Sequence, residues 1–443
     1  MHRKRRTAIE VKQPAEGAAL PLPYDLFVDD VLTRLPPRDL AVARGVRRSW
    51  RAAIDGSRLL RADLLPLSVG GIFIDFNDHR FPEYFSNPST SPTIPSMLDY
   101  LLDSIKTTRI SITGHCNGLL LLDGDYVVNP AKRWWARVPP HLHTLEEHFN
   151  YWNYLVFDPT LSSHYEVFSV PHLYGDGVDE DELDPTIEEF DEWPPSSCIL
   201  QVFSSTTNGW EGRSLIRDGE AAGTVSNMRK DVVQPDRYVY YKGVLYVQCQ
   251  TNFVMRISLS DSKYQAIKPP PGIEDPHLGK SKHGIYFASL GYPDDGCRLR
   301  IWVLNESAGQ AEWMLKCHAD LTCVLHQNFS ILPPGSWVLQ DVNYNLQRDL
   351  FSNDKNEEHT EEKEIWDFEN DKSYDDWGSF MFLGFHPFEE VVFLSQSLNW
   401  GLAYDLNSLK AEYLGYLYPT KYGYFAEVSK EIMASYPYTP CWM

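Results

Sequence analysis

Cysteine and histidine side chains with metal-binding chemistry occur at two places in the chain. Cys317, His318, Cys323 and His326 offer four zinc-type ligands, but two adjacent ligands fit a tetrahedral site poorly, and residues 313–317 are typical of a strand that buries its thiol. His143 and His148 are not spaced like H-E-x-x-H, in which both imidazoles share one helix face. We therefore expect no metal and no cofactor.

The motifs of common enzyme classes are missing from the sequence. It contains no G-x-S-x-G, no Walker phosphate loop and no G-x-G-x-x-G after a strand. Asp and Glu are so abundant that a pair of them says little about glycosidase chemistry, which needs carboxylates that converge with shifted pKa values. We expect a non-catalytic chain, and a hydrolase is the weakest alternative.

The charge distribution restricts the class of partner. The formal net charge is −21, of which residues 1–66 contribute +5 and the remainder −26. An acidic body argues against nucleic acid or an anionic membrane as the main ligand, because both attract clustered positive charge. Seven widely spaced cysteines form no disulfide framework, and the first twenty residues do not resemble a secretory signal. We expect a cytoplasmic or nuclear protein, or one found in both compartments.

Three segments have the composition of solvated chain. Residues 1–20 are polar and include the basic cluster 3–6, which predicts a disordered basic tail and is also compatible with a nuclear-localisation patch. Residues 176–192 contain ten Asp and Glu, and residues 354–376 are similarly acidic. We interpret both acidic stretches as surface insertions, with docking of a basic substrate as the alternative.

A short helical module is predicted between residues 21 and 66. Pro23 suits a first helical turn, and Pro36-Pro37 ends that helix. A second helix capped by Asp39 then places apolar residues on one face at three- and four-residue steps: Leu40, Ala43, Val46, Trp50 and Ile54.

From residue 67 onward the pattern changes to short β-type runs separated by Gly, Pro, Asn and Asp turns. The plan of a Gly–apolar strand followed by further strands recurs every 40–55 residues, the size of a four-stranded propeller blade. The sequence therefore predicts a mainly β protein with a β-propeller-like domain of five to seven blades over residues 67–443. A large β-sandwich is the rival architecture.

The helical module resembles an F-box. The residues that carry the resemblance are Leu22, Pro23, Leu26, Val31, Leu32, Leu35, Pro36, Leu40, Val46 and Trp50. The pair Arg47-Arg48 departs from the pattern at a rim position. The resemblance implies a three-helix module at 21–66 that docks a Skp-type adaptor and, through it, a cullin–RING ubiquitin ligase.

Residues 114–135 and 157–168 resemble the F-box-associated region of plant F-box proteins, which is similar to kelch-type propellers. The resemblance implies a substrate-recognition adaptor that binds an unknown target protein through its β domain. A propeller that binds carbohydrate or another small ligand is the alternative, and a central pocket lined by tryptophans would favour it. Most tryptophans should pack between blades, and Trp210 at a loop tip is a candidate contact residue.

Overall fold

The computed structural model divides the chain into two compact units, Met1–Pro66 with Trp442–Met443, and Leu67–Cys441. No helix in the described part of the chain is both long and apolar enough to span a bilayer. The residues that the structure describes are 31–35, 40, 43, 46–57, 59, 68–89, 94, 98, 100–101, 109–123, 125–141, 149–173, 190–229, 237–249, 253–270, 273, 276–291, 297–306, 311–325, 335–352, 380–422 and 430–441.

The described residues of the smaller unit form the 3-10 helix η2 (Leu32–Arg34) and the helix α3 (Arg48–Gly56). Their core is apolar and consists of Leu32, Leu40, Ala43, Ala53 and Ile54. The prediction of one continuous helical face through Val46 is wrong. Arg47 is not helical, and its carbonyl accepts the first hydrogen bond of α3 from the backbone amide of Arg51. Val46 is 58% exposed. Val46 therefore does not share the buried face of Leu40 and Ala43. The described residues do not show a three-helix module.

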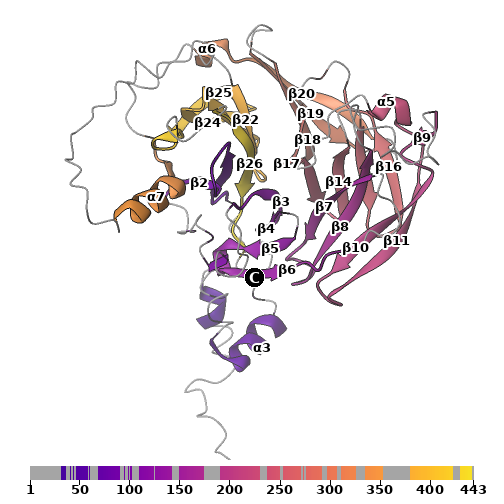
Figure 1. The fold of residues 1–443 in the computed structure, drawn as a ribbon, viewed down its shortest axis with the longest axis horizontal. Coiled ribbons are helices and arrows are strands. Elements are labelled where there is room, and N and C mark those ends of the chain that lie inside the picture. The colour runs from indigo at the N-terminus through magenta and orange to yellow at the C-terminus, as the bar shows by residue number, and fades with distance from the viewer. Residues whose placement is uncertain are drawn as a thin grey trace, which may run out of the picture. The chain divides into compact units, whose positions relative to one another are not determined.

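The larger unit is mainly β, as predicted, and its described strands form six four-stranded antiparallel blades (Figure 1). From the innermost strand outward, blade 1 is β26 (Ile432–Tyr438), β1 (Gly71–Phe76), β2 (Glu83–Ser86) and β21 (Val338–Leu339); blade 2 is β3 (Ile112–Cys116), β4 (Leu119–Leu122), β5 (Tyr126–Asn129) and β6 (Trp134–Arg137); blade 3 is β7 (Phe149–Phe157), β8 (Tyr165–Leu173), β10 (Ser197–Ser204) and β11 (Gly209–Arg217). Blade 4 is β13 (Tyr238–Tyr241), β14 (Val244–Cys249), β15 (Phe253–Ser258) and β16 (Lys263–Ile267); blade 5 is β17 (Pro276–Ser281), β18 (Gly284–Leu290), β19 (Arg298–Asn305) and β20 (Glu312–Asp320); blade 6 is β22 (Phe380–Phe385), β23 (Val391–Gln396), β24 (Trp400–Asp405) and β25 (Lys410–Tyr416).

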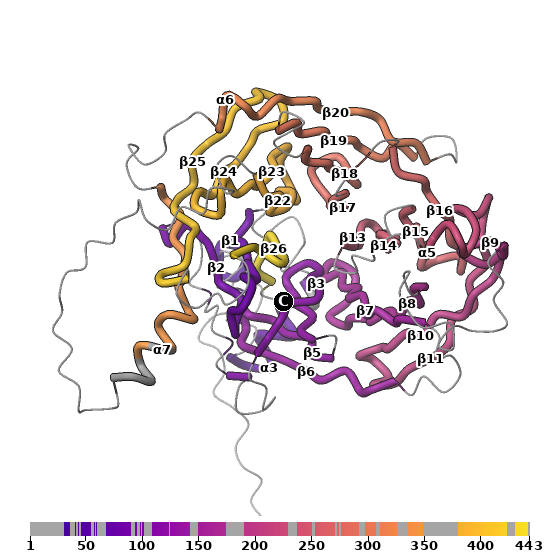
Figure 2. The backbone as a smooth tube through the Cα atoms, turned by 45° about the horizontal axis from the view of Figure 1, so that its top comes forward, coloured from indigo at the N-terminus to yellow at the C-terminus, as the bar shows by residue number. Residues whose placement is uncertain are grey.

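The blades are arranged in a closed ring, which favours a propeller over a sandwich. The innermost strands contact one another in the order β26, β3, β7, β13, β17 and β22, and β22 contacts β26 again. Figure 2 shows these strands nearest the centre, with blades spreading outward. Six blades lie within the predicted five to seven. Blades 3 and 4 are further joined because the outer strands β11 and β16 pair in parallel.

The two ends of the larger unit meet in blade 1. The last strand, β26, pairs antiparallel with the first, β1, from Gly71 opposite Tyr438 to Phe76 opposite Ile432. The chain after β26 is then fastened to blade 2, because the Asn129 side chain donates to the Cys441 carbonyl at 3.0 Å and the Tyr438 hydroxyl donates to the Gly118 carbonyl at 3.1 Å. The first and last strands of the larger unit therefore share one blade, which closes the ring.

Strands such as β1, β4 and β18 are buried at every position, whereas β3 follows the period-2 alternation of a half-buried strand. In β3, Ile112, Gly114 and Cys116 are buried while the intervening Thr113 and His115 keep part of their surface accessible. Glycines occur where large side chains of other blades approach an inner strand: a Cβ at Gly114 of blade 2 would lie 2.5 Å from the Tyr238 ring of blade 4, and one at Gly279 of blade 5 would overlap the Phe385 ring of blade 6. These glycines allow the inner strands to pack closely.

Aromatic rings fill the spaces between blades, as the sequence predicts. Trp302 belongs to the buried cluster shared by blades 4 and 5. The prediction of Trp210 as an exposed contact residue at a loop tip is corrected by its packing. Trp210 is half-buried, its indole N–H donates to the Pro139 carbonyl at 2.8 Å, and its ring contacts His141. The remaining described elements are β9 (Glu192–Trp193), β12 (Gly223–Thr224), η4 (Pro130–Lys132), α5 (Val225–Arg229), α6 (Thr322–Leu325) and α7 (Val342–Ser352).

Candidate functional sites

The predicted docking residues of the small unit differ in their surroundings. Leu32 and Leu40 are buried in its core, and Leu35 and Trp50 pack against that core while remaining half-buried. Val31 and Val46 are exposed, at 38% and 58%. Four of the ten predicted residues lie outside the described residues: Leu22, Pro23, Leu26 and Pro36.

The sequence positions with metal-binding chemistry do not come together in the described part of the larger unit. Cys317 is buried on β20, whereas His318 and Cys323 are exposed. His143, His148 and His326 lie outside the described residues. Among the described residues there is no group of three His, Cys, Asp or Glu side chains suited to a metal ion.

The innermost strands surround the axis of the ring, which is the position of the central channel in a propeller. These six strands contain no Asp or Glu, so they do not supply a pair of catalytic carboxylates. Of the tryptophans among the described residues, Trp152 on β7 alone lies on an innermost strand. The inner strands therefore lack the several tryptophans expected of a carbohydrate-binding pocket.

One polar cluster occupies the end of the ring at which the inner strands finish. Lys280, the penultimate residue of β17, reaches from blade 5 to blade 2, where its ammonium donates to the side-chain oxygen of Asn117 at 2.6 Å. The side-chain nitrogen of Asn117 donates to the backbone carbonyl of Phe157, the last residue of β7 in blade 3, at 2.7 Å. Asp158 follows directly. The cluster thus connects three blades.

The electrostatics of this cluster are set mainly by burial. Burial lowers the pKa of Lys280, although Cys116 and Asp158 act in the opposite direction. Burial and the nearby Lys280 charge lower the pKa of His115 to about 4, so this imidazole is neutral at pH 7. Burial raises the pKa of the Cys116 thiol to about 11. The thiol donates to the Phe157 carbonyl and accepts from the Phe157 backbone N–H, both at 3.3 Å. The cluster therefore places Lys280 beside the neutral imidazole of His115, the Cys116 thiol and the side chain of Asp158.

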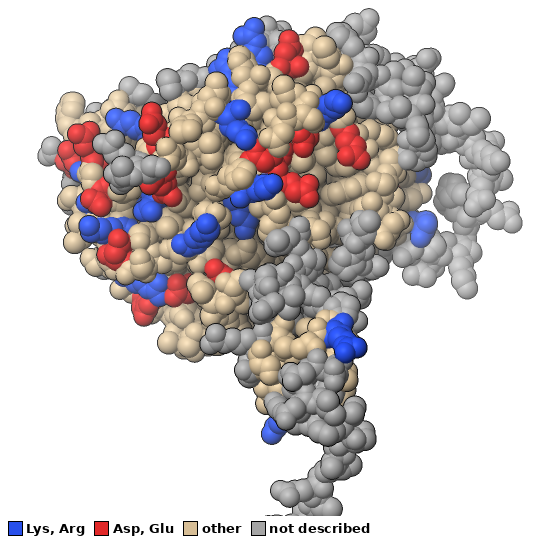
Figure 3. Space-filling model, turned by 180° about the vertical axis from the view of Figure 1, so that it is seen from behind, with Lys and Arg blue, Asp and Glu red and all other residues tan. Residues whose placement is uncertain are grey.

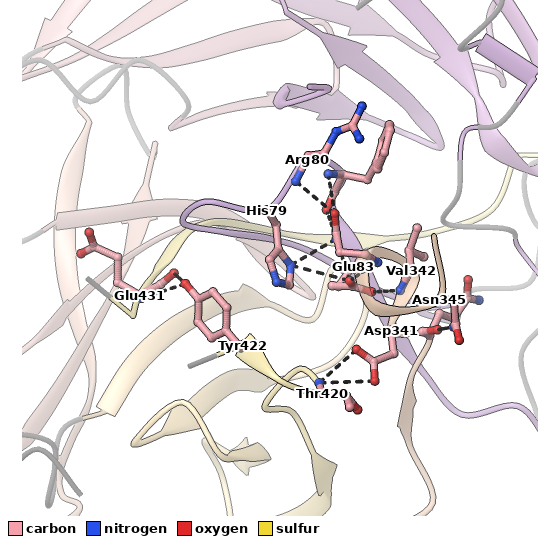
Figure 4. Close-up of polar contacts among 12 residues, drawn as sticks. His79, Arg80, Glu83, Asp341, Val342, Asn345, Thr420, Tyr422 and Glu431 are labelled. Atoms are coloured by element: carbon pink, nitrogen blue, oxygen red, sulfur yellow. Dashed lines mark hydrogen bonds and ion pairs between the residues drawn. The ribbon is translucent and has the colours of Figure 1, made fainter. Parts of the chain in front are cut away.

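A second cluster, shown in Figure 4, caps the helix α7. The fully buried Glu83 accepts from the Val342 amide at 2.7 Å, the Asn343 amide at 3.1 Å and the Asn343 side chain at 2.7 Å. Burial raises the pKa of Glu83, while these bonds act against that shift. A carboxylate at a helix N-terminus satisfies the free amides there. We therefore assign this cluster a structural role.

Two further carboxylates link neighbouring blades. Glu390 of blade 6 lies 2.5 Å from the Lys316 ammonium of blade 5 and also accepts from the Tyr286 hydroxyl. Glu306, just after β19, lies 2.5 Å from the Arg256 guanidinium and 3.0 Å from the Tyr246 hydroxyl of blade 4. Each interface thus combines a tyrosine on the second strand of one blade, a basic side chain of the same blade and a glutamate from the next blade.

The face drawn in Figure 3 does not carry the acidic excess as one patch. On the face drawn in Figure 3, acidic and basic side chains are interspersed. Much of the acidic sequence, residues 176–189 and 354–376, lies outside the described residues. The two predicted acidic insertions therefore lie almost entirely outside the described residues, and their placement on the surface stays a prediction.

Sequence reasoning did not find the Lys280 cluster. Asn117-Gly118 carries a turn signal, and both residues have positive φ, 45° and 91°. Lys280, however, is separated from Asn117 by 163 residues, and the alternation of β17 alone does not specify what its side chain meets.

Comparison with known proteins adds little. No family model and no curated protein matches the chain. Among solved structures, the chain is similar to YCF48 bound to a D1 peptide, with 6% sequence identity, coverage of 79% of this chain and 82% of that chain, and a TM-score of 0.31. This likeness carries no argument, and the propeller architecture rests on the sheet order and ring contacts given above.

Proposed function

We propose that the chain is the substrate-recognition adaptor of a Skp–cullin–F-box ubiquitin ligase, acting in the cytoplasm, the nucleus or both. The small unit docks the Skp-type adaptor and the propeller binds a target protein. The chain supplies effective concentration and orientation, whereas the ligation chemistry belongs to other subunits.

The observation that carries the proposal is the exposure of two apolar side chains in the small unit. Val31 is 38% and Val46 58% exposed, although Leu32 and Leu40 beside them in the sequence pattern are fully buried. The F-box resemblance assigns both valines to the docking surface, and their exposure leaves both side chains accessible to a partner. The propeller is consistent with a protein-binding domain, because its loops are carried by a rigid ring.

The test is the affinity of the full chain for a recombinant Skp-type adaptor, measured by calorimetry. We expect Val46→Asp to weaken binding at least tenfold, because it places a charge in an apolar contact. The matched control is Val338→Asp, which makes the same change at a valine of similar exposure, 55%, on the propeller strand β21. If both variants bind like the unchanged chain, the docking assignment is wrong.

A further inference from the structure

The Lys280 cluster has the composition of a ligand site that the adaptor function does not use. Its side chains come from the carboxyl ends of inner strands: Asn117 after β3, Asp158 after β7 and Lys280 on β17. Tyr240 on β13 adds a fourth blade, because its side chain interacts with Asp158. Lys280, Asn117 and Asp158 each keep part of their surface accessible. Groups from four blades therefore meet at one end of the channel without being sealed from solvent.

The positive charge of Lys280 is not balanced by an ion pair. None of the ion pairs among the described residues includes this lysine. Asp158, the nearby carboxylate, is engaged in its own turn, where Oδ1 accepts from the Thr160 amide at 2.9 Å and the Thr160 hydroxyl at 2.6 Å. A carboxylate ligand beside Lys280 would add a negative charge close to the ammonium, in the same sense as Asp158 and Cys116, which raise its pKa against the effect of burial.

We propose that this end of the channel binds the carboxylate of a ligand, with the Lys280 ammonium as its principal partner. An ammonium has three donors, and Asn117 takes one of them, so two remain for the two oxygens of a carboxylate. Asp158 opposes a second negative charge, so a monoanionic carboxylate suits the site better than a phosphate dianion. The carboxylate belongs either to a small acid or to the C-terminus of a peptide.

This inference holds whether or not the small unit docks a Skp-type adaptor. It is tested on the full chain by the rate at which a lysine-specific acylating reagent modifies Lys280, followed residue by residue by mass spectrometry. We expect propionate to slow this modification at least threefold, and phosphate at equal ionic strength to slow it less. Lys263, which is 52% exposed on blade 4, is the internal control and should react at an unchanged rate.

A second measurement removes dependence on the reagent. Propionate should raise the Tm of the unchanged chain and of Lys263→Met, but not of Lys280→Met, because ligands stabilise the state that they bind. A peptide with a free C-terminus that protects Lys280 better than its amidated twin identifies a chain terminus as the source. If propionate protects Lys280 and the free and amidated peptides protect it equally at the same concentrations, the source of the carboxylate is a small acid and not a chain terminus. Absence of protection by propionate and by the free peptide, or equal protection by phosphate, overturns the proposal.

Discussion

The ammonium of Lys280 lies 2.6 Å from the side-chain oxygen of Asn117, and these two residues come from blades 5 and 2, on opposite sides of the ring. This single bond spans the channel. Asn117 also holds the end of β7 through the Phe157 carbonyl. One asparagine in a tight turn therefore ties three blades together at the channel end.

The first prediction concerns Asn117. Asn117→Ala leaves the Phe157 carbonyl and the Lys280 ammonium each short of one partner, so the free energy of unfolding should fall by about 1–3 kcal/mol. Asn208→Ala is the control, because Asn208 is exposed and has a similar positive φ, 53° against 45°. Denaturant unfolding of the two variants separates the lost bonds from backbone strain. Equal losses in both would show that the Asn117 bonds contribute nothing.

The second prediction concerns the cap of α7. Glu83→Ala leaves the amides of Val342 and Asn343 without their acceptor in a buried place, so the unfolding free energy should fall by about 2–4 kcal/mol. Glu83→Gln keeps an acceptor oxygen and should cost less. Hydrogen exchange of the first turn of α7 reports the effect directly. Unchanged protection in Glu83→Ala would contradict the capping role.

The third prediction is a loss of stability in acid. Burial lowers the pKa of His79, His115 and His172 to about 4 from 6.5, so the folded state binds fewer protons than the unfolded state between these values. Their contribution is complete above pH 6.5 and is lost as the pH falls toward 4. Asp75, whose pKa burial raises to about 6, acts in the opposite direction between pH 6 and 3.8.

His172 allows this prediction to be isolated. It is buried and pairs with the Tyr154 hydroxyl at 2.8 Å. In His172→Gln the dependence of unfolding free energy on pH between 6.5 and 4 should flatten by about 1.4 kcal/mol per pH unit, the value for one proton. His164→Gln, at an exposed position, should keep the slope of the unchanged chain. Identical slopes in the two variants would count against the assignment.

The fourth prediction compares the two glutamates between blades. Glu390→Ala leaves Lys316 and Tyr286 without their partner around a buried carboxylate site, so it should cost about 2–4 kcal/mol of unfolding free energy. Glu306→Ala removes a similar set of contacts at a more open site, where the Glu306 side chain is 38% exposed, and should cost about 1 kcal/mol or less. Thermal unfolding of both ranks them. The reverse order would show that burial does not control these links.

The sequence predicted the architecture better than the site. Short apolar runs between Gly, Pro, Asn and Asp turns, as in 118–130, were sufficient to predict blades, because strand length and turn chemistry are local. The face through Val46 was mispredicted because Gly45, two residues before the break at Arg47, was not given weight as a residue that weakens a helix. The Lys280–Asn117 bond could not be predicted, because it depends on ring closure that brings distant strands together.

The exposure of Val31 and Val46 leads to the most direct test of the proposed adaptor function. The measurement is co-purification of the full chain with a Skp-type adaptor and a cullin, compared with Val31→Asp combined with Val46→Asp. We predict that the unchanged chain retains both partners and that the double variant retains neither, while its thermal unfolding is unchanged. Failure of the unchanged chain to retain the adaptor, or equal retention by the double variant, would contradict the account.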